Sequence, residues 1–136
     1  HVLPALIRRF HEAKENLAEE VVIWGTGKPR RELMHVDDLA AGVLFLLEID
    51  SPPDWVNLGT GIDHSISEIA NLVKEVVGFT GEISNDLSKP DGMPVKRLDV
   101  SLAQSLGWTS KISLEEGIQS AYEDFIKSLA SNTARL

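Results

Sequence analysis

Residues 24–38 bring together the side chains of this chain that are best suited to binding a ligand. Trp24 offers a flat aromatic surface, and the glycine turn after it, Gly25-Thr26-Gly27, leads into three cations, of which Arg31 is the last. Aromatic rings pack against bases and sugars, and a guanidinium group can bind phosphate through two parallel hydrogen bonds. The spacing therefore predicts one surface for a phosphorylated ligand that carries a ring, such as a nucleotide.

Composition narrows the class of protein. The chain has 136 residues, 43% of them apolar and 25% charged, which is typical of one globular domain. Its formal net charge of −8 gives no general attraction to nucleic acid or to an anionic membrane, so we expect neither as a partner. It has no cysteine, no apolar run long enough to span a bilayer and no signal peptide, which is compatible with a cytoplasmic protein. Because the sequence starts at His1 without an initiator Met, we expect a fragment of a longer protein.

The hydrophobic pattern predicts helices that alternate with short strands. The expected helices begin at Pro4, at Asp37 or Asp38, and at the capping boxes Ser65–Glu68 and Ser113–Glu116, with a short helical piece ending at Leu106. In the second of these helices, one apolar stripe is formed by Leu39, Val43, Leu46 and Leu47. The expected strands are 21–24, 55–58, 82–86 and 96–100. These elements predict one α/β (or α+β) lobe over residues 1–130, with 131–136 as a frayed tail, and the short strands indicate that the lobe packs on something larger.

Several familiar motifs are absent from the sequence. A dinucleotide fingerprint needs a third glycine three residues after each Gly-Thr-Gly turn, but Arg30 and His64 occupy those positions. The histidines are scattered, so no metal site is expected. Reductases of the short-chain type pair a tyrosine with a lysine four residues later, whereas here the only tyrosine, Tyr122, is followed at that distance by Ile126. By itself, the chain shows no residues for hydride transfer, and Tyr122 is expected in the core.

Two loops, Trp24-Gly25-Thr26-Gly27 and Lys89-Pro90-Asp91-Gly92, are the most specific segments of the sequence. They occur together with His1-Val2-Leu3-Pro4-Ala5-Leu6, Arg31-Glu32, His35-Val36-Asp37-Asp38, Asn57-Leu58-Gly59-Thr60-Gly61, Leu98-Asp99-Val100 and Leu106-Gly107-Trp108. In this combination nearly the whole chain resembles the C-terminal part of the GDP-L-fucose synthase family, a group of extended short-chain dehydrogenases/reductases.

The resemblance implies a substrate-binding lobe without the N-terminal Rossmann domain of that family, which carries the NADP site and the reductase residues. The family converts GDP-4-keto-6-deoxy-D-mannose to GDP-L-fucose by epimerisation at C3 and C5 and NADPH-dependent reduction at C4. The lobe would bind the GDP-sugar and orient it against chemistry in the other domain, so the isolated chain is expected to be inactive. A homodimeric, cytoplasmic parent enzyme is also implied.

Six positions match residues that contact the ligand or cofactor in the family: His1, Arg9, Trp24, Arg31, Asp91 and Lys96. By that match, Arg9 and Arg31 contact the diphosphate, and His1 is the acid of the epimerisation and a neighbour of the cofactor. The remaining three contact the substrate. Where the family has Thr and Arg in the second loop, this chain has Met93 and Val95.

These positions also have ordinary structural explanations. Without a ligand role, Arg9 would be a solvated helix arginine, Trp24 a buried residue at a strand end, and Arg31 a surface cation. Asp91 would simply begin a turn, and His1 would be an unordered chain end. The resemblance favours the ligand role at Arg9, Trp24 and Arg31.

Other residues are interpreted as structural. Lys28 and Arg30 are rim charges, His35 is a hydrogen-bonded residue near the core, and Trp55 and Trp108 are packing residues.

Two alternative functions stay open. The chain could be the lobe of a different sugar-nucleotide epimerase or dehydratase, although the Lys-Pro-Asp-Gly loop argues against this. It could also be a truncated, non-catalytic binding module, which the missing half supports.

Overall fold

The computed structural model describes residues 1–131, so the predicted tail at 131–136 lies outside the described residues except for Ser131, which ends the last helix. The helices are α1 (Val2–Glu15), α2 (Val36–Glu48), α3 (Ile66–Val77), α4 (Ser101–Ser105) and α5 (Leu114–Ala130). The strands are β1 (Glu20–Trp24), β2 (Arg30–Glu32), β3 (Asp63–Ser65), β4 (Glu82–Asp86) and β5 (Val95–Lys96). Helices and short strands alternate, which confirms the predicted α/β lobe. In the described part of the chain, no helix is both long and apolar enough to cross a membrane.

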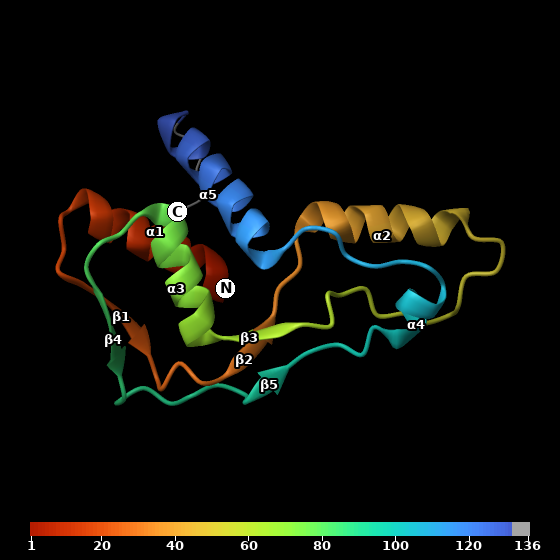
Figure 1. The fold of residues 1–136 in the computed structure, drawn as a ribbon, viewed down its shortest axis with the longest axis horizontal. Coiled ribbons are helices and arrows are strands. Elements are labelled where there is room, and N and C mark those ends of the chain that lie inside the picture. The colour runs from red at the N-terminus through yellow and green to blue at the C-terminus, as the bar shows by residue number, and fades with distance from the viewer. Residues whose placement is uncertain (132–136) are drawn as a thin grey trace.

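The molecule has a packed end and an extended end (Figure 1). At the packed end, α1 and α3 lie beside the β1–β4 pair, and α5 rises next to them. At the extended end, α2 and α4 lie on either side of long connecting segments. The small sheet of β3, β2 and β5 lies between the two ends and joins them.

Two separate strand pairings position the loops that matter for the site. β1 and β4 run parallel, with Trp24 opposite Asp86. β2 pairs antiparallel with β3 and parallel with β5, which places Arg31 beside Lys96. The strand predicted at 96–100 is much shorter in the structure, where β5 covers only Val95–Lys96. Strands β2 and β3 were not predicted, because three residues are too few to show a hydrophobic pattern.

The core lies at the packed end, where α1, β1 and α3 meet α5. Phe10, Ile69 and Ile118 are fully buried there, and Phe10 meets Phe79 edge-to-face with ring centres 5.6 Å apart. Burial of one such side chain stabilises the fold by about 1.5–3 kcal/mol. This core fixes β1, and Trp24 lies at the exposed end of that strand.

The predicted ends of α3 and α5 are confirmed. Ser65 and Ser113 each accept a hydrogen bond from the backbone N–H three residues later, and the glutamate at that position accepts one from the serine's backbone N–H. Gly78 ends α3 in the left-handed conformation, with φ of 73°.

The start of α2 differs from the prediction that Asp37 or Asp38 caps it. His35 is the cap, because its Nδ1 accepts a hydrogen bond from the backbone N–H of Asp37 at 3.2 Å. Asp38 is buried instead and accepts hydrogen bonds from the backbone N–H groups of Lys111 at 3.0 Å and Ile112 at 2.9 Å. Asp38 thus ties α2 to the segment that precedes α5.

The extended end departs most from the prediction. Residues 55–58 form no strand and make no backbone–backbone hydrogen bond within the described chain, and Trp55 is 87% exposed rather than packed. Trp108 is buried as predicted, with its ring against Gly42. A strand needs a partner for its backbone groups, and no described strand lies beside residues 55–58.

Helix α2 also exposes most of its predicted apolar stripe. We call this exposed side the outer face of α2, and it consists of Val36, Leu39, Val43, Leu44 and Leu47. The buried residues of the helix are Asp38 and Gly42. A helix that is apolar on nearly all sides is typically buried by other parts of a protein on more than one side. The described residues of this chain bury only the side of α2 that carries Asp38 and Gly42.

Candidate functional site

The first part of the site is the turn at the end of β1. Trp24 is 65% exposed, which excludes the alternative that it is a buried strand-end residue. The backbone after it is tied to β4. The N–H of Gly25 donates to the carbonyl of Asp86, and the side-chain amide of Asn85 donates to the carbonyl of Gly25, both at 2.9 Å. The indole is therefore presented to solvent from fixed backbone.

The second part is the segment 87–94, called here the KPDG loop after its residues 89–92. It is fastened to the Trp24 turn through the Asp91 carboxylate, which accepts hydrogen bonds from the backbone N–H of Thr26 at 2.8 Å and from the Thr26 hydroxyl at 2.7 Å. These bonds stabilise the charged form and lower the pKa of Asp91. Gly25 has a φ of 72°, and a Cβ there would lie 2.3 Å from Asp91 Oδ1, so this close approach needs glycine.

The third part is Arg31 on β2. Its Nη1 donates to the carbonyl oxygens of Arg30 and Met93, both at 2.7 Å, so the guanidinium is held beside the KPDG loop. Within residues 1–131 Arg31 makes no ion pair with a carboxylate. Lys96 stands opposite it in the parallel β2–β5 register, and such neighbours project from the same face roughly 5 Å apart. Two cations that lack carboxylate partners therefore share one face.

Arg30, which was predicted to be a rim charge, belongs instead to an ion-pair network. Its guanidinium donates to the Asp63 carboxylate and to the Asp63 carbonyl at 2.8 Å, and it lies 3.5 Å from Glu68. Asp63 raises the pKa of Arg30, and the guanidinium lowers the pKa of Asp63. Successive strand residues face opposite sides, so the prediction was wrong because β2 had not been recognised. Lys28 is exposed and unpaired among the described residues, as expected.

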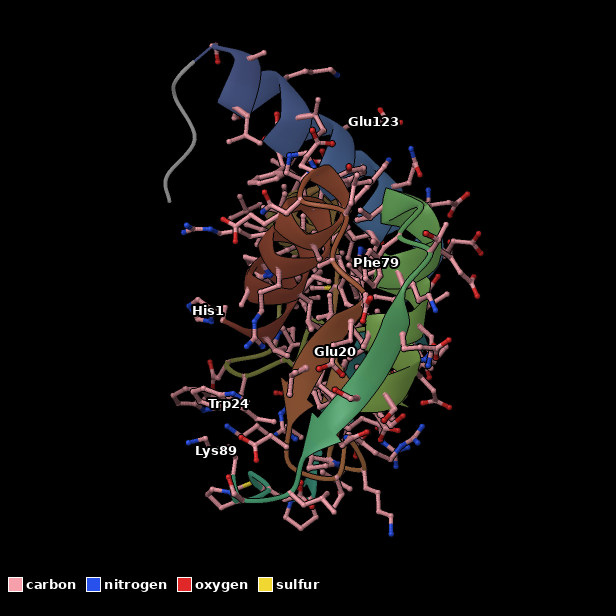
Figure 2. All side chains as sticks on the ribbon, turned by 90° about the vertical axis from the view of Figure 1, so that its left-hand side faces the viewer. His1, Glu20, Trp24, Phe79, Lys89 and Glu123 are labelled. Carbon is pink, nitrogen blue, oxygen red and sulfur yellow. The ribbon has the colours of Figure 1, made fainter. Side chains whose placement is uncertain are left out.

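Lys89 is a candidate that the sequence analysis missed. Its ammonium nitrogen lies 5.6 Å from the centre of the Trp24 ring, within the range of a cation–π interaction. Figure 2 shows Trp24 and Lys89 together, on the same side of the molecule as His1. Lys89 lies only two residues before Asp91. The β1–β4 pairing would have revealed it, because that pairing brings the KPDG loop to the Trp24 turn.

Glu32 is a second residue that was missed, and its role is structural. Its Oε1 accepts a hydrogen bond from the N–H of Gly61 at 2.9 Å, and its Oε2 accepts one from the N–H of Leu98 at 2.6 Å. Glu32 thereby holds the second glycine turn and the segment after β5 against the strand that carries Arg31.

His1 and Arg9 belong to α1 rather than to these loops. His1 is the exposed residue before the helix, and its side chain makes no capping hydrogen bond. Arg8 pairs with Glu12 at 2.6 Å, whereas Arg9 makes no ion pair in the described part of the chain. No hydrogen bond or ion pair among residues 1–131 links His1 or Arg9 to the Trp24–Asp91 group, so their roles stay predictions.

At both Gly-Thr-Gly turns, side chains of this protein lie close to one of the glycines. A Cβ on Gly27 would lie 2.1 Å from Ser67 Oγ, and one on Gly59 would lie 2.2 Å from Glu32 Oε1. Protein groups therefore already fill the space that these glycines open. At Gly27 and Gly59 the close approach therefore serves contacts within the chain.

Comparison with known sequences gives a consistent result. Residues 1–59 match the model of the NAD dependent epimerase/dehydratase family. GDP-L-fucose synthase 1 of Arabidopsis thaliana is 55% identical over 131 residues, which are 96% of this chain and 41% of that protein. The chain thus spans about two fifths of the length of the curated relatives that it matches.

Solved structures agree with the sequence comparison. A GDP-L-fucose synthetase from Naegleria fowleri superposes with a TM-score of 0.89 at 26% identity, over 100% of this chain and 41% of the other. A GDP-mannoheptose C4 reductase from Campylobacter jejuni, solved with NADP bound, gives a TM-score of 0.78 at 41% identity, over 90% of this chain and 44% of the other. The fold is therefore that of part of an extended short-chain dehydrogenase/reductase.

Proposed function

We propose that this chain, which is similar over nearly its whole length to GDP-L-fucose synthases, is the C-terminal, substrate-binding lobe of such an enzyme. In this proposal the lobe binds the GDP part of GDP-4-keto-6-deoxy-D-mannose and orients the sugar. The rest of the enzyme supplies the NADP site, and the complete enzyme epimerises C3 and C5 and reduces C4 to give GDP-L-fucose. Binding energy from the GDP part would then position the reacting sugar.

The observation that carries this proposal is an exposed indole and an arginine without a carboxylate partner, Trp24 and Arg31, that both border the KPDG loop, with Lys96 opposite the arginine. Trp24 can cover the base or the ribose, while Arg31 and Lys96 can bind the diphosphate. With a net charge of −8, the chain as a whole does not attract anions, so local cations must hold a diphosphate. Each Asp91 oxygen can accept a second hydrogen bond, which leaves room for a ribose hydroxyl or a base edge.

Further roles belong to the same proposal. Arg9 would add a diphosphate contact, and His1 would be the acid of the epimerisation and a neighbour of the cofactor. The outer face of α2 and residues 55–58 would pack against the part of the enzyme that carries the NADP site. A homodimeric parent enzyme and a cytoplasmic location stay predictions from the resemblance.

Calorimetry with the 136-residue chain tests the proposal. We expect weak binding of GDP, at least about tenfold weaker binding of UDP, and no oxidation of NADPH in the presence of GDP-4-keto-6-deoxy-D-mannose. Equal affinity for GDP and UDP would favour the lobe of a different sugar-nucleotide enzyme. NADPH oxidation by the purified chain would contradict the assignment of the reducing chemistry to another domain.

A pair of cation variants tests where the diphosphate binds. Arg31→Ala should weaken GDP binding by roughly 10–100-fold, because a charge-assisted hydrogen bond to phosphate is lost. Lys28→Ala, at an exposed cation just before β2, is the matched control and should change the affinity less than about threefold. Equal effects of the two variants would place the diphosphate elsewhere.

A second candidate is the lobe of a GDP-sugar C4 reductase that does not epimerise. The 41% identity to the reductase from Campylobacter jejuni favours it. GDP binding would be the same in both cases, so the products formed by the complete enzyme decide between them.

A further inference from the structure

We propose that Thr26 is a positioning residue for the nucleotide, because it latches the KPDG loop onto the Trp24 turn and so holds Lys89 over the indole as a further contact for the phosphates. This inference rests on the proposed GDP-binding function. It concerns two residues, Thr26 and Lys89, to which the resemblance assigned no role.

The latch consists of two hydrogen bonds to one carboxylate. The Thr26 backbone N–H and hydroxyl donate to different oxygens of Asp91, at 2.8 and 2.7 Å, across 65 residues of sequence. The hydroxyl oxygen also accepts a hydrogen bond from the N–H of Lys28 at 3.2 Å, which fixes its direction. The side chain of Thr26 therefore joins the C-terminal end of the Trp24 turn to the loop.

Little else holds the loop in place. Residues 87–94 are exposed throughout. Besides the latch, the hydrogen bonds of these residues within the described chain are of two kinds. Ser88 and Lys89 donate to Asp86 in a turn, and the carbonyl oxygens of Met93 and Pro94 accept from the Arg31 guanidinium and the Arg30 N–H, both at 2.7 Å. These two lie at the C-terminal end of the loop. Among residues 1–131, the hydrogen bonds at Asp91 are the only ones that hold the middle of the loop, close to Lys89.

The held position has a chemical consequence. With Lys89 over one face of the Trp24 ring, the cation stays beside the surface that would cover the base or ribose. Arg31, fastened to the same loop through the Met93 carbonyl, supplies a second cation. A loop that is already held in its binding position costs a ligand less conformational entropy than a free loop.

The test compares three threonine variants of the 136-residue chain. Thr26→Val removes the hydroxyl but keeps the shape and the backbone N–H, Thr26→Ser keeps the hydroxyl, and Thr80→Val makes the same change at an exposed threonine without a hydrogen bond in the described chain. We expect Thr26→Val to weaken GDP affinity by about 3–10-fold, with Thr26→Ser and Thr80→Val within about twofold of the original chain.

A ligand-free measurement separates the latch from the function. Amide hydrogen exchange at Arg30, whose N–H bonds to Pro94 at the far end of the loop, should become at least about fivefold faster in Thr26→Val and stay unchanged in the two other variants. Lys89→Gln should weaken GDP binding without changing that exchange rate.

The outcomes are distinct. If the original chain binds GDP and Thr26→Val binds it equally well, the positioning role is overturned. If Lys89→Gln binds GDP like the original chain, Lys89 is no phosphate contact. If the original chain does not bind GDP at all, the proposed function fails, and unchanged exchange at Arg30 in Thr26→Val would then overturn the latch independently.

Discussion

At the scale of single residues, neighbouring side chains of the same type have different tasks. Arg30 and Arg31 are adjacent in sequence, yet Arg30 pairs with the Asp63 carboxylate whereas Arg31 donates to two backbone carbonyl oxygens. The division follows from the alternation of side chains along β2. Similarly, Asp91 was predicted as a ligand contact, and the structure shows that its carboxylate already joins two loops.

The lowered pKa of Asp91 gives a prediction for stability against pH. Because the pKa of Asp91 in the folded chain lies below the usual value of 3.8, the charged carboxylate stabilises the fold above about pH 4, and this contribution is lost as the pH falls through the folded pKa. Thermal unfolding should show Asp91→Asn to be less stable than the original chain at pH 6, with the difference shrinking as the pH falls below about 4. Asp54→Asn, an exposed carboxylate without a described partner, is the control. A difference that is independent of pH would show that the charge of Asp91 is not involved.

At the scale of elements, the sequence predicted most local features, apart from the His35 cap of α2, and missed what depends on distant partners. The capping boxes at Ser65 and Ser113 and the stop at Gly78 are confirmed, because each rests on atoms within a few residues. The strand expected at 55–58 is wrong, since its formation depends on a neighbour that the described chain does not provide. The three-residue strands β2 and β3 could not be predicted, and the position of Arg31 depends on them.

The buried Asp38 provides a prediction for how elements are joined. Asp38→Ala should lower the free energy of unfolding by about 1–3 kcal/mol, because it leaves the backbone N–H groups of Lys111 and Ile112 without their acceptor. Asp37→Ala, at an exposed position in the same turn, should cost less than about 0.5 kcal/mol. Chemical denaturation measures both, and equal losses would indicate that the aspartates act only on the helix dipole.

At the scale of the whole molecule, the packed end has a complete core and the extended end does not. The outer face of α2 and Trp55 leave apolar side chains in solvent, where a continuous patch favours association. The sequence predicted such a surface only indirectly: because the expected strands are few and short, the lobe was expected to pack on something larger. Which side of an apolar helix stays uncovered cannot be read from its own sequence.

Self-association of the isolated chain follows from that surface. The double variant Leu44→Lys and Leu47→Lys, at side chains that are 61% and 76% exposed, should reduce association in sedimentation experiments without lowering the unfolding temperature. Leu17→Lys changes a leucine that is 89% exposed but lies outside the face, and should leave association unchanged. A chain that stays monomeric at high concentration would contradict this prediction.

The long sequence separation of the contacts around β2 has a consequence for the order of folding. Arg31 bonds to a residue 62 positions away, and Glu32 to one 66 positions away. Contacts between residues so far apart in sequence form late, because a long loop must close before they stabilise the fold. Among the elements of this chain, α1 and β1 leave the ribosome before the others, but the surface around Trp24 and Arg31 cannot assemble until Leu98 has left it. The surface proposed to bind the nucleotide therefore acquires its native form late, although α5, which adds Ile118 to the core, leaves the ribosome later still.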